Sequence, residues 1–199
     1  GAELVTNGTF ASNTASWTFA SATGSVTSGE LLMTTSASYG AVRQTITTVV
    51  GKTYTAVVTA RRGTSDRYLI TITGATQVSK TNTSNQTDVV TWVATTTSTL
   101  VEIAGGSTTG TVYVDSFLVR LAEEDRSVNG NGLQVFGSIT KTAVATGADL
   151  VGYSGFSASN YLEQPYNSDL DFGTGDFCVM GWVNKSGNSS IDTYASVGD

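Results

Sequence analysis

The stretch at residues 111–120, TVYVDSFLVR, is a β-run with apolar residues at both parities and a single acid, Asp115, at its centre. Side chains alternate between the two faces of a strand, so the run divides into two sets. One face is expected to hold Tyr113, Asp115, Phe117 and Val119, and the other Val112, Val114 and Leu118. A strand with two apolar faces is typical of a sheet interior, so this pattern predicts a strand inside a β-sandwich.

Asp115 is the most informative acid of the chain, because this pattern places it in an apolar layer. A bare carboxylate there would cost several kcal/mol or shift its pKa, so the group must be hydrogen-bonded, paired or bound to a cation. Two interpretations stay open: a hydrogen bond from a neighbouring backbone N–H, and an oxygen-coordinated metal, for which charge and hardness favour calcium.

Composition favours strands throughout the chain. Thirty-four Thr, 22 Gly and one Pro among 199 residues suit pleated strands joined by Gly and Asn turns. Residues 2–121 show about nine or ten short β-patterns separated by turn signals. Such regular spacing predicts an all-β fold, either a sandwich or a barrel, and two packed sheets with long crossovers would make a jelly roll.

The formal charge of −6 is unevenly distributed along the chain. Residues 1–120 hold seven basic and six acidic side chains, whereas residues 121–199 hold three and ten. This split favours two domains. Neither half has the Lys/Arg stripe that phosphate binding needs, so no nucleic-acid partner is expected. Membrane insertion is not expected either, because the longest apolar runs have the length of strands.

Several short motifs of the first 120 residues occur in the order found in a known family. They are Asn7 to Phe10 (NGTF), Ser16-Trp17, Val50 to Tyr54 (VGKTY), Thr91-Trp92 and Val112 to Asp115 (VYVD). Together they resemble the jelly-roll carbohydrate-binding modules of families four, nine and twenty-two. The resemblance implies a structural calcium ion near the first and last strands, with Asp115 as a ligand and Asn7 as a neighbour. The family often places an acid where this chain has Ala11.

A second segment follows an acidic, Asn/Gly-rich linker. Residues 122–132 (AEEDRSVNGNG) have almost nothing to bury, which predicts domains at 1–121 and 133–199. Residues 155–183 (GFSASNYLEQPYNSDLDFGTGDFCVMGWV) resemble the start of laminin-G or concanavalin-A-like domains of phage and marine viral tail proteins. The resemblance implies a partial lectin-like β-sandwich, with a strand at Tyr161-Leu162 and an inner strand at residues 177–183.

A carbohydrate site in such a sandwich needs aromatic rings outside the core, with polar side chains beside them. The strand context of Trp17, Tyr54, Trp92, Tyr113 and Phe117 predicts that these rings are core. Tyr39, in a polar turn, and Tyr68, after an Arg-rich stretch, are the remaining candidates, with Arg43 and Gln44 as polar neighbours. Gln44 shares parity with Val42 and Ile46, so it either lines a groove or satisfies buried backbone groups.

Catalysis finds little support in the sequence. The chain has no His, and Cys178 is its single cysteine. A glycosidase needs two carboxyl groups about 5 to 9 Å apart, but the acids of the first domain are scattered, and Asp169, Asp171 and Asp176 lie in a predicted solvated turn. We therefore expect a non-enzymatic chain.

The sequence leads to three functional hypotheses. The first is a viral (phage) tail fibre or other virion appendage whose sandwich recognises host surface glycans, with other virion subunits as partners and a homotrimer among the assemblies considered. The second is a spacer or decoration module of a virion that binds other subunits and no sugar. The third is an accessory carbohydrate-binding module of a secreted, extracellular polysaccharide-degrading enzyme.

Overall fold

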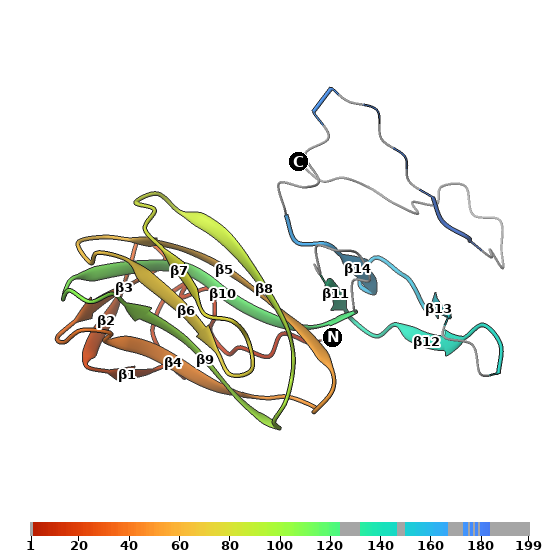
Figure 1. Cartoon of the computed structure of the whole chain (residues 1–199), viewed down its shortest axis with the longest axis horizontal. Helices are drawn as coiled ribbons and strands as arrows, with labels where there is room; N and C mark the ends of the chain where they lie inside the picture. The colour runs from red at the N-terminus through yellow and green to blue at the C-terminus, as the bar shows by residue number, and fades with distance from the viewer. Residues whose placement is uncertain are drawn as a thin grey trace. The chain divides into compact units, whose positions relative to one another are not determined.

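A computed structural model describes residues 2–123, 132–146, 150–166, 173–174, 176, 178 and 180–183. Within these ranges, β-strands are the sole regular elements, and no helix long and apolar enough to cross a membrane is found there. The chain divides into two compact units, residues 1–167 and 168–199. The sandwich lies in the first unit, and its strands can be followed in Figure 1.

Two antiparallel sheets form the sandwich. The first, called the β4 sheet here, has the order β1 (Thr18–Ala20), β4 (Ala41–Thr47), β9 (Ser98–Gly105), β6 (Tyr68–Ile72) and β7 (Val78–Lys80). The second, called the β5 sheet, has the order β2 (Ala22–Thr27), β3 (Glu30–Thr35), β10 (Thr111–Glu123), β5 (Thr53–Arg62) and β8 (Gln86–Val93).

The strand order is that of a jelly roll. Along the chain, β3, β5, β8 and β10 belong to one sheet, while β4, the β6–β7 hairpin and β9 belong to the other. The resulting orders, β3-β10-β5-β8 and β4-β9-β6-β7, place each long crossover between the two sheets. The predicted all-β jelly-roll sandwich is therefore confirmed.

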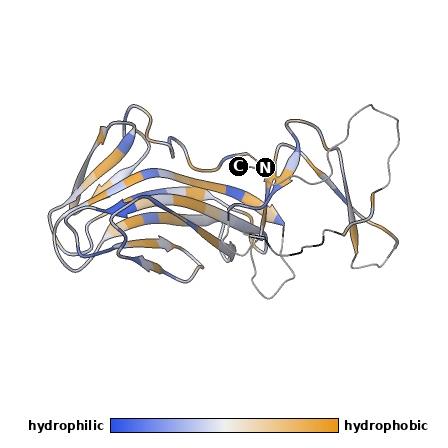
Figure 2. Cartoon of the chain, turned by 90° about the horizontal axis from the view of Figure 1, so that it is seen from above, coloured by the Kyte–Doolittle hydropathy of each residue, from blue (hydrophilic) through white to orange (hydrophobic). Residues whose placement is uncertain are grey.

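The core lies between the two sheets and follows the period of two expected of half-buried strands. Inward side chains include Val58 and Val114 from the β5 sheet and Val42 and Ile103 from the β4 sheet. Hydropathy alternates along the strands in Figure 2. Of the rings predicted to be core, Trp17, Tyr54, Trp92 and Phe117 are buried, while Tyr113 is half buried beneath Arg61 on the outer face.

A β-bulge divides β10 between Val114 and Ser116. A bulge adds one residue to a strand and shifts the alternation of all later side chains. The buried residues are Val112 and Val114 before the bulge, and Phe117 and Val119 after it. Asp115 is exposed at the bulge. The predicted division of this strand into two faces is therefore wrong beyond Val114, and Asp115 does not lie in an apolar layer.

Strand β10 continues past the predicted domain end at Leu121. Its last residues, Ala122 and Glu123, pair with β11 (Leu133–Phe136), which pairs in turn with β14 (Tyr161–Glu163). A hairpin of β12 (Thr140–Ala143) and β13 (Val151–Ser154) lies between them in the chain. The strand predicted at Tyr161-Leu162 is confirmed. The division at residues 122–132 stays a prediction. Of the strand predicted at residues 177–183, Cys178 and residues 180–183 are described and belong to no strand, so that strand is not found there, while residues 177 and 179 lie outside the described residues.

Candidate functional site

Tyr39 stands at the end of the β4 sheet, in the turn between β3 and β4. Its side chain is 58% exposed, and its backbone adopts a left-handed φ of 59°. Bulky residues seldom adopt positive φ, and such conformations persist where the surroundings determine them. The Tyr39 N–H donates to the carbonyl of Gly106 (2.8 Å), and the Gly105 N–H donates to the carbonyl of Gly40 (2.8 Å). These bonds fix the turn against the end of β9.

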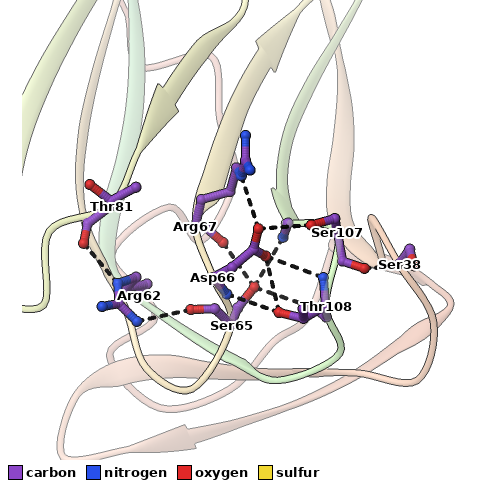
Figure 3. A network of polar contacts seen from close by, with 9 residues as sticks. Ser38, Arg62, Ser65, Asp66, Arg67, Thr81, Ser107 and Thr108 are labelled. Atoms are coloured by element: carbon purple, nitrogen blue, oxygen red, sulfur yellow. Dashed lines mark hydrogen bonds and ion pairs between the residues drawn. The ribbon is translucent and has the colours of Figure 1, made fainter.

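A polar network centred on Asp66 ties three loops together at this end of the sandwich (Figure 3). Asp66 Oδ1 accepts hydrogen bonds from the N–H and Oγ1 of Thr108 (3.2 and 3.1 Å). Its Oδ2 accepts from Ser107 Oγ (2.9 Å) and Arg67 Nε (3.1 Å). Ser38 Oγ, next to Tyr39, donates to the carbonyl of Ser107 (2.9 Å). The turn that carries Tyr39 is thus held by the β5–β6 and β9–β10 loops.

These hydrogen bonds also set the charge state of Asp66. The Thr108 N–H, followed by Ser107 and Arg67, holds the pKa of the Asp66 carboxyl well below its usual range. Hydrogen bonds to the ionised form stabilise it. Asp66 therefore stays ionised at any ordinary pH, and the network keeps its hydrogen bonds.

The outer face of the β4 sheet carries two charged side chains on neighbouring strands. Arg43 of β4 and Glu102 of β9 are cross-strand partners, in a row that Thr18 and Thr71 extend on either side. Both side chains are partly exposed. Within the described residues, neither side chain forms a hydrogen bond or an ion pair. Their donors and acceptors therefore stay available to a ligand.

A row of small or apolar side chains separates these charges from Tyr39. Ala41, Ala104 and Leu69 are paired across β4, β9 and β6, and they form a buried cluster apart from the main core. Tyr39 precedes Ala41 by two residues and Arg43 follows it by two. An exposed ring in the turn before β4 thus accompanies an unpaired cation and an unpaired anion on the outer face of β4 and β9.

Tyr68 does not belong to this face, and its predicted role in ligand binding is wrong. Its side chain is fully buried, because Tyr68 shares parity with Ile70 and Ile72 on the inner side of β6. The hydroxyl lies within hydrogen-bond distance of Asp88 Oδ2 (3.2 Å), Asn82 Oδ1 (3.1 Å) and the carbonyl oxygen of Ala60 (3.3 Å), and these three acceptors share its single hydrogen. Tyr68 is therefore a core residue that connects the two sheets.

Gln44 satisfies backbone groups, which is one of the two alternatives that its parity allowed. Its Nε2 donates to the carbonyls of Thr6 (3.0 Å) and Ser16 (3.1 Å), and its Oε1 accepts from the Thr6 N–H (2.8 Å). Both amide hydrogens are used in this way. Gln44 closes the opening loop and has little left to offer a ligand, so its predicted role in binding is not supported by its contacts.

The two predicted metal residues lie in different settings. Asn7 is in the opening loop, where its Nδ2 donates to oxygens of Asn13 and Ala15. Asp115 is exposed at the bulge of β10, close enough to Arg61 for its charge to raise the pKa of that guanidinium, which Glu30 raises most. In the described ranges, no three Asp, Glu or Cys side chains gather into a metal-binding group.

Sequence reasoning missed Glu102. The alternation of Val101, Glu102 and Ile103 was a local sign that Glu102 points outward from β9. Its position beside Arg43 depends on the pairing of β4 with β9, however, and residues 59 apart in the chain show no such pairing in their own pattern.

The fold is similar to those of solved carbohydrate-binding modules. A structure described as "CBM4 structure and function" is 22% identical over 57% of this chain and 97% of that one, with a TM-score of 0.47. The CBM22-1 xylan-binding domain of Paenibacillus barcinonensis Xyn10C is 11% identical over 61% of this chain and 95% of that domain, with a TM-score of 0.49.

A viral structure shows a comparable likeness. The enzymatically active domain of tailspike protein 4 from bacteriophage CBA120 is 16% identical over 60% of this chain and 21% of that one, with a TM-score of 0.43. No family model matches the sequence, and no curated protein matches it. These likenesses concern the fold alone.

Proposed function

We propose that the jelly-roll sandwich recognises a carbohydrate on the outer face of the β4 sheet and catalyses no reaction. The observation that carries this proposal is the pair Arg43 and Glu102 on the outer face of the β4 sheet, whose charges have no partner in the described chain, together with the exposed ring of Tyr39 in the turn before β4. Aromatic rings bind the apolar faces of pyranoses. A guanidinium offers five N–H donors and a carboxylate offers acceptors, which suits sugar hydroxyls.

Several features support a shallow site. Ala41 and Ala104, in the row between the Tyr39 turn and Arg43, have small side chains that do not project from the sheet. The Asp66 network holds the Tyr39 turn in place before a ligand arrives, which lowers the entropy lost on binding. A shallow surface buries little area, so each site binds weakly, and several copies side by side would raise the avidity.

We place this module in a viral surface appendage such as a tail fibre, with host surface glycans and other virion subunits as its partners. The support is the resemblance of residues 155–183 to laminin-G-like domains of phage and marine viral tail proteins. An accessory module of a secreted polysaccharide-degrading enzyme would use the same face. The full reading frame distinguishes these settings, because the gene of a polysaccharide-degrading enzyme would also encode a catalytic domain beside this chain.

Binding is tested with the 199-residue chain displayed in several copies on a glycan array. Tyr39→Ala is expected to weaken binding of the best glycan about tenfold, which corresponds to about 1.4 kcal/mol, because the stacking ring is lost. Tyr161→Ala is the matched control: Tyr161 is also an exposed tyrosine, but it lies on β14, away from the β4 sheet.

The outcomes separate the hypotheses. If no glycan binds the multivalent chain, the proposal fails and the spacer or decoration module takes its place. If a glycan binds equally well to Tyr39→Ala and to the unaltered chain, the chain recognises sugar at another place. Equal losses in both tyrosine variants would likewise contradict the assignment to the β4 sheet.

A further inference from the structure

The opening loop, residues 6–17, closes around one side-chain nitrogen. Asn7 Nδ2 lies 2.9 Å from the carbonyl oxygen of Asn13, 3.0 Å from Asn13 Oδ1 and 3.2 Å from the carbonyl oxygen of Ala15. Asn13 Oδ1 also accepts the Ala15 N–H (2.9 Å). An amide nitrogen has two hydrogens, so three oxygens share two donors. Oxygens converging on a single point are the arrangement that usually surrounds a cation.

The rest of the loop keeps Asn7 in this place. Its backbone has a left-handed φ of 55°, which Asn tolerates better than most residues. Its carbonyl accepts the indole N–H of Trp17 (3.1 Å), and the Trp17 ring packs against Phe10 and Phe117 in the core (centroids 5.2 and 5.9 Å). The neighbouring Gly8 carbonyl accepts the Phe117 N–H (2.7 Å). The amide is thus positioned by core packing and not by loop residues alone.

The residues present do not fit the calcium ion that the family resemblance implies. Calcium takes about six to eight oxygen ligands, several of them carboxylates. The oxygens around Asn7 face a hydrogen-bond donor, and N–H groups repel a cation. No carboxylate is among them: Ala11 stands at the family's acidic position, and Asp115 lies at the bulge within reach of the Arg61 charge.

We propose that the side-chain amide of Asn7 takes the position of the cation in the opening loop, so that this sandwich folds without calcium. The amide supplies the positive ends of two N–H bonds to oxygens that a calcium ion would otherwise hold together. The opening loop is thus a latent metal site. A carboxylate at position 7 would remove the donors and leave only oxygens at the centre of the loop.

The test compares melting temperatures of the 199-residue chain in excess EDTA and in millimolar calcium chloride. The unaltered chain is expected to melt at the same temperature in both. Asn7→Asp is expected to melt roughly 2 to 8 °C lower in EDTA, because it loses the hydrogen bonds that the Asn7 amide donates. Calcium should then raise its melting temperature, since an ion bound only to the folded state stabilises that state.

Asn7→Ala is the matched control, because it loses the same donors without gaining a carboxylate. Its melting temperature should fall and should not respond to calcium. A calcium-dependent rise in the unaltered chain would overturn the proposal, as would an Asn7→Asp chain that folds and ignores calcium. If Asn7→Asp is unfolded in EDTA, its circular dichroism on adding calcium gives the same answer: recovery of the β-sheet signal supports the proposal, and a persistently unfolded spectrum contradicts it.

Discussion

The outer faces of the two sheets each carry an arginine and a glutamate, but they use them differently. On the β5 sheet, both Nη atoms of Arg61 bond the carboxylate of Glu30 (2.5 and 2.7 Å), and Asn85 Nδ2 adds a third bond to it (2.8 Å). The guanidinium also lies 4.2 Å above the ring of Tyr113. On the β4 sheet, Arg43 and Glu102 are direct cross-strand partners without a bond between their side chains.

The difference distinguishes charged side chains that stabilise the fold from charged side chains that are available to a ligand. Bidentate pairing and ring stacking fix the Arg61 group in one geometry, and the hydrogen bonds from Arg61 hold the pKa of Glu30 below its usual range. Arg43 and Glu102 keep their hydration, which a hydroxyl-bearing ligand can replace. We therefore expect substitutions on the β5 face to change stability and substitutions on the β4 face to change binding.

The largest expected effect is the loss of stability on substitution of Tyr68, which lies in the core beneath the β4 sheet. Tyr68→Ala should lower the free energy of unfolding by roughly 3 to 5 kcal/mol, as for other buried aromatic rings, because it empties a core position and removes a partner of Asp88. Tyr68→Phe, which keeps the ring, should cost only about 1 to 2 kcal/mol. Denaturant unfolding measures both. A Tyr68→Ala chain of unchanged stability that no longer binds glycan would restore Tyr68 to the binding site.

The next effect compares the two arginines directly. Arg61→Ala should lower the free energy of unfolding by about 1 to 2 kcal/mol and leave glycan binding unchanged. Arg43→Ala should leave stability within about 0.5 kcal/mol and weaken glycan binding about five- to tenfold. Denaturant unfolding measures the stability of both variants, and the glycan array measures their binding. If both variants lose stability and binding to the same extent, the two sheet faces do not divide these roles.

The smallest effect concerns the Asp66 network that holds the Tyr39 turn. The folded-state pKa of Asp66 is depressed, so its contribution to stability is present above the unfolded pKa of about 3.9 and is lost as pH falls through the lower folded value. The melting-temperature difference between the unaltered chain and Asp66→Asn should thus be constant from neutral pH to about pH 5 and shrink below pH 4. A difference that grew on acidification would contradict this sign.

The β-sandwich followed from the sequence because alternation and turn spacing are local signals, whereas its jelly-roll topology was implied only by the resemblance of the ordered motifs to a known family. The same rule failed within β10, where the bulge at Asp115 shifts the parity and makes a strand with one inner face look apolar on both. A bulge depends on how two neighbouring strands pair, and no single residue in TVYVDSFLVR marks it. The error carried over to Asp115, whose predicted burial depended on an unbroken alternation.

The candidate site was predicted only in part, because strand pairing is again not visible in the local sequence. Tyr39 was identified because a polar turn around an aromatic residue indicates exposure, and its exposure is confirmed. Tyr68 was misplaced although its parity with Ile70 and Ile72 indicated an inner position, because the arginines before it suggested a surface. The pairing of Arg43 with Glu102 comes from the register between β4 and β9, which depends on the packing of the whole sandwich.

The 13 residues of β10 have a mechanical consequence. This strand pairs with β5 from Val112 to Leu121, with β3 at Thr111 to Val114, and beyond Leu121 with β11. A force applied along β10 would act on these hydrogen bonds in shear, so they would have to break together and could not open one after another as in a peeled hairpin. Tension passing along β10 toward β11 would therefore load its hydrogen bonds to β5 together.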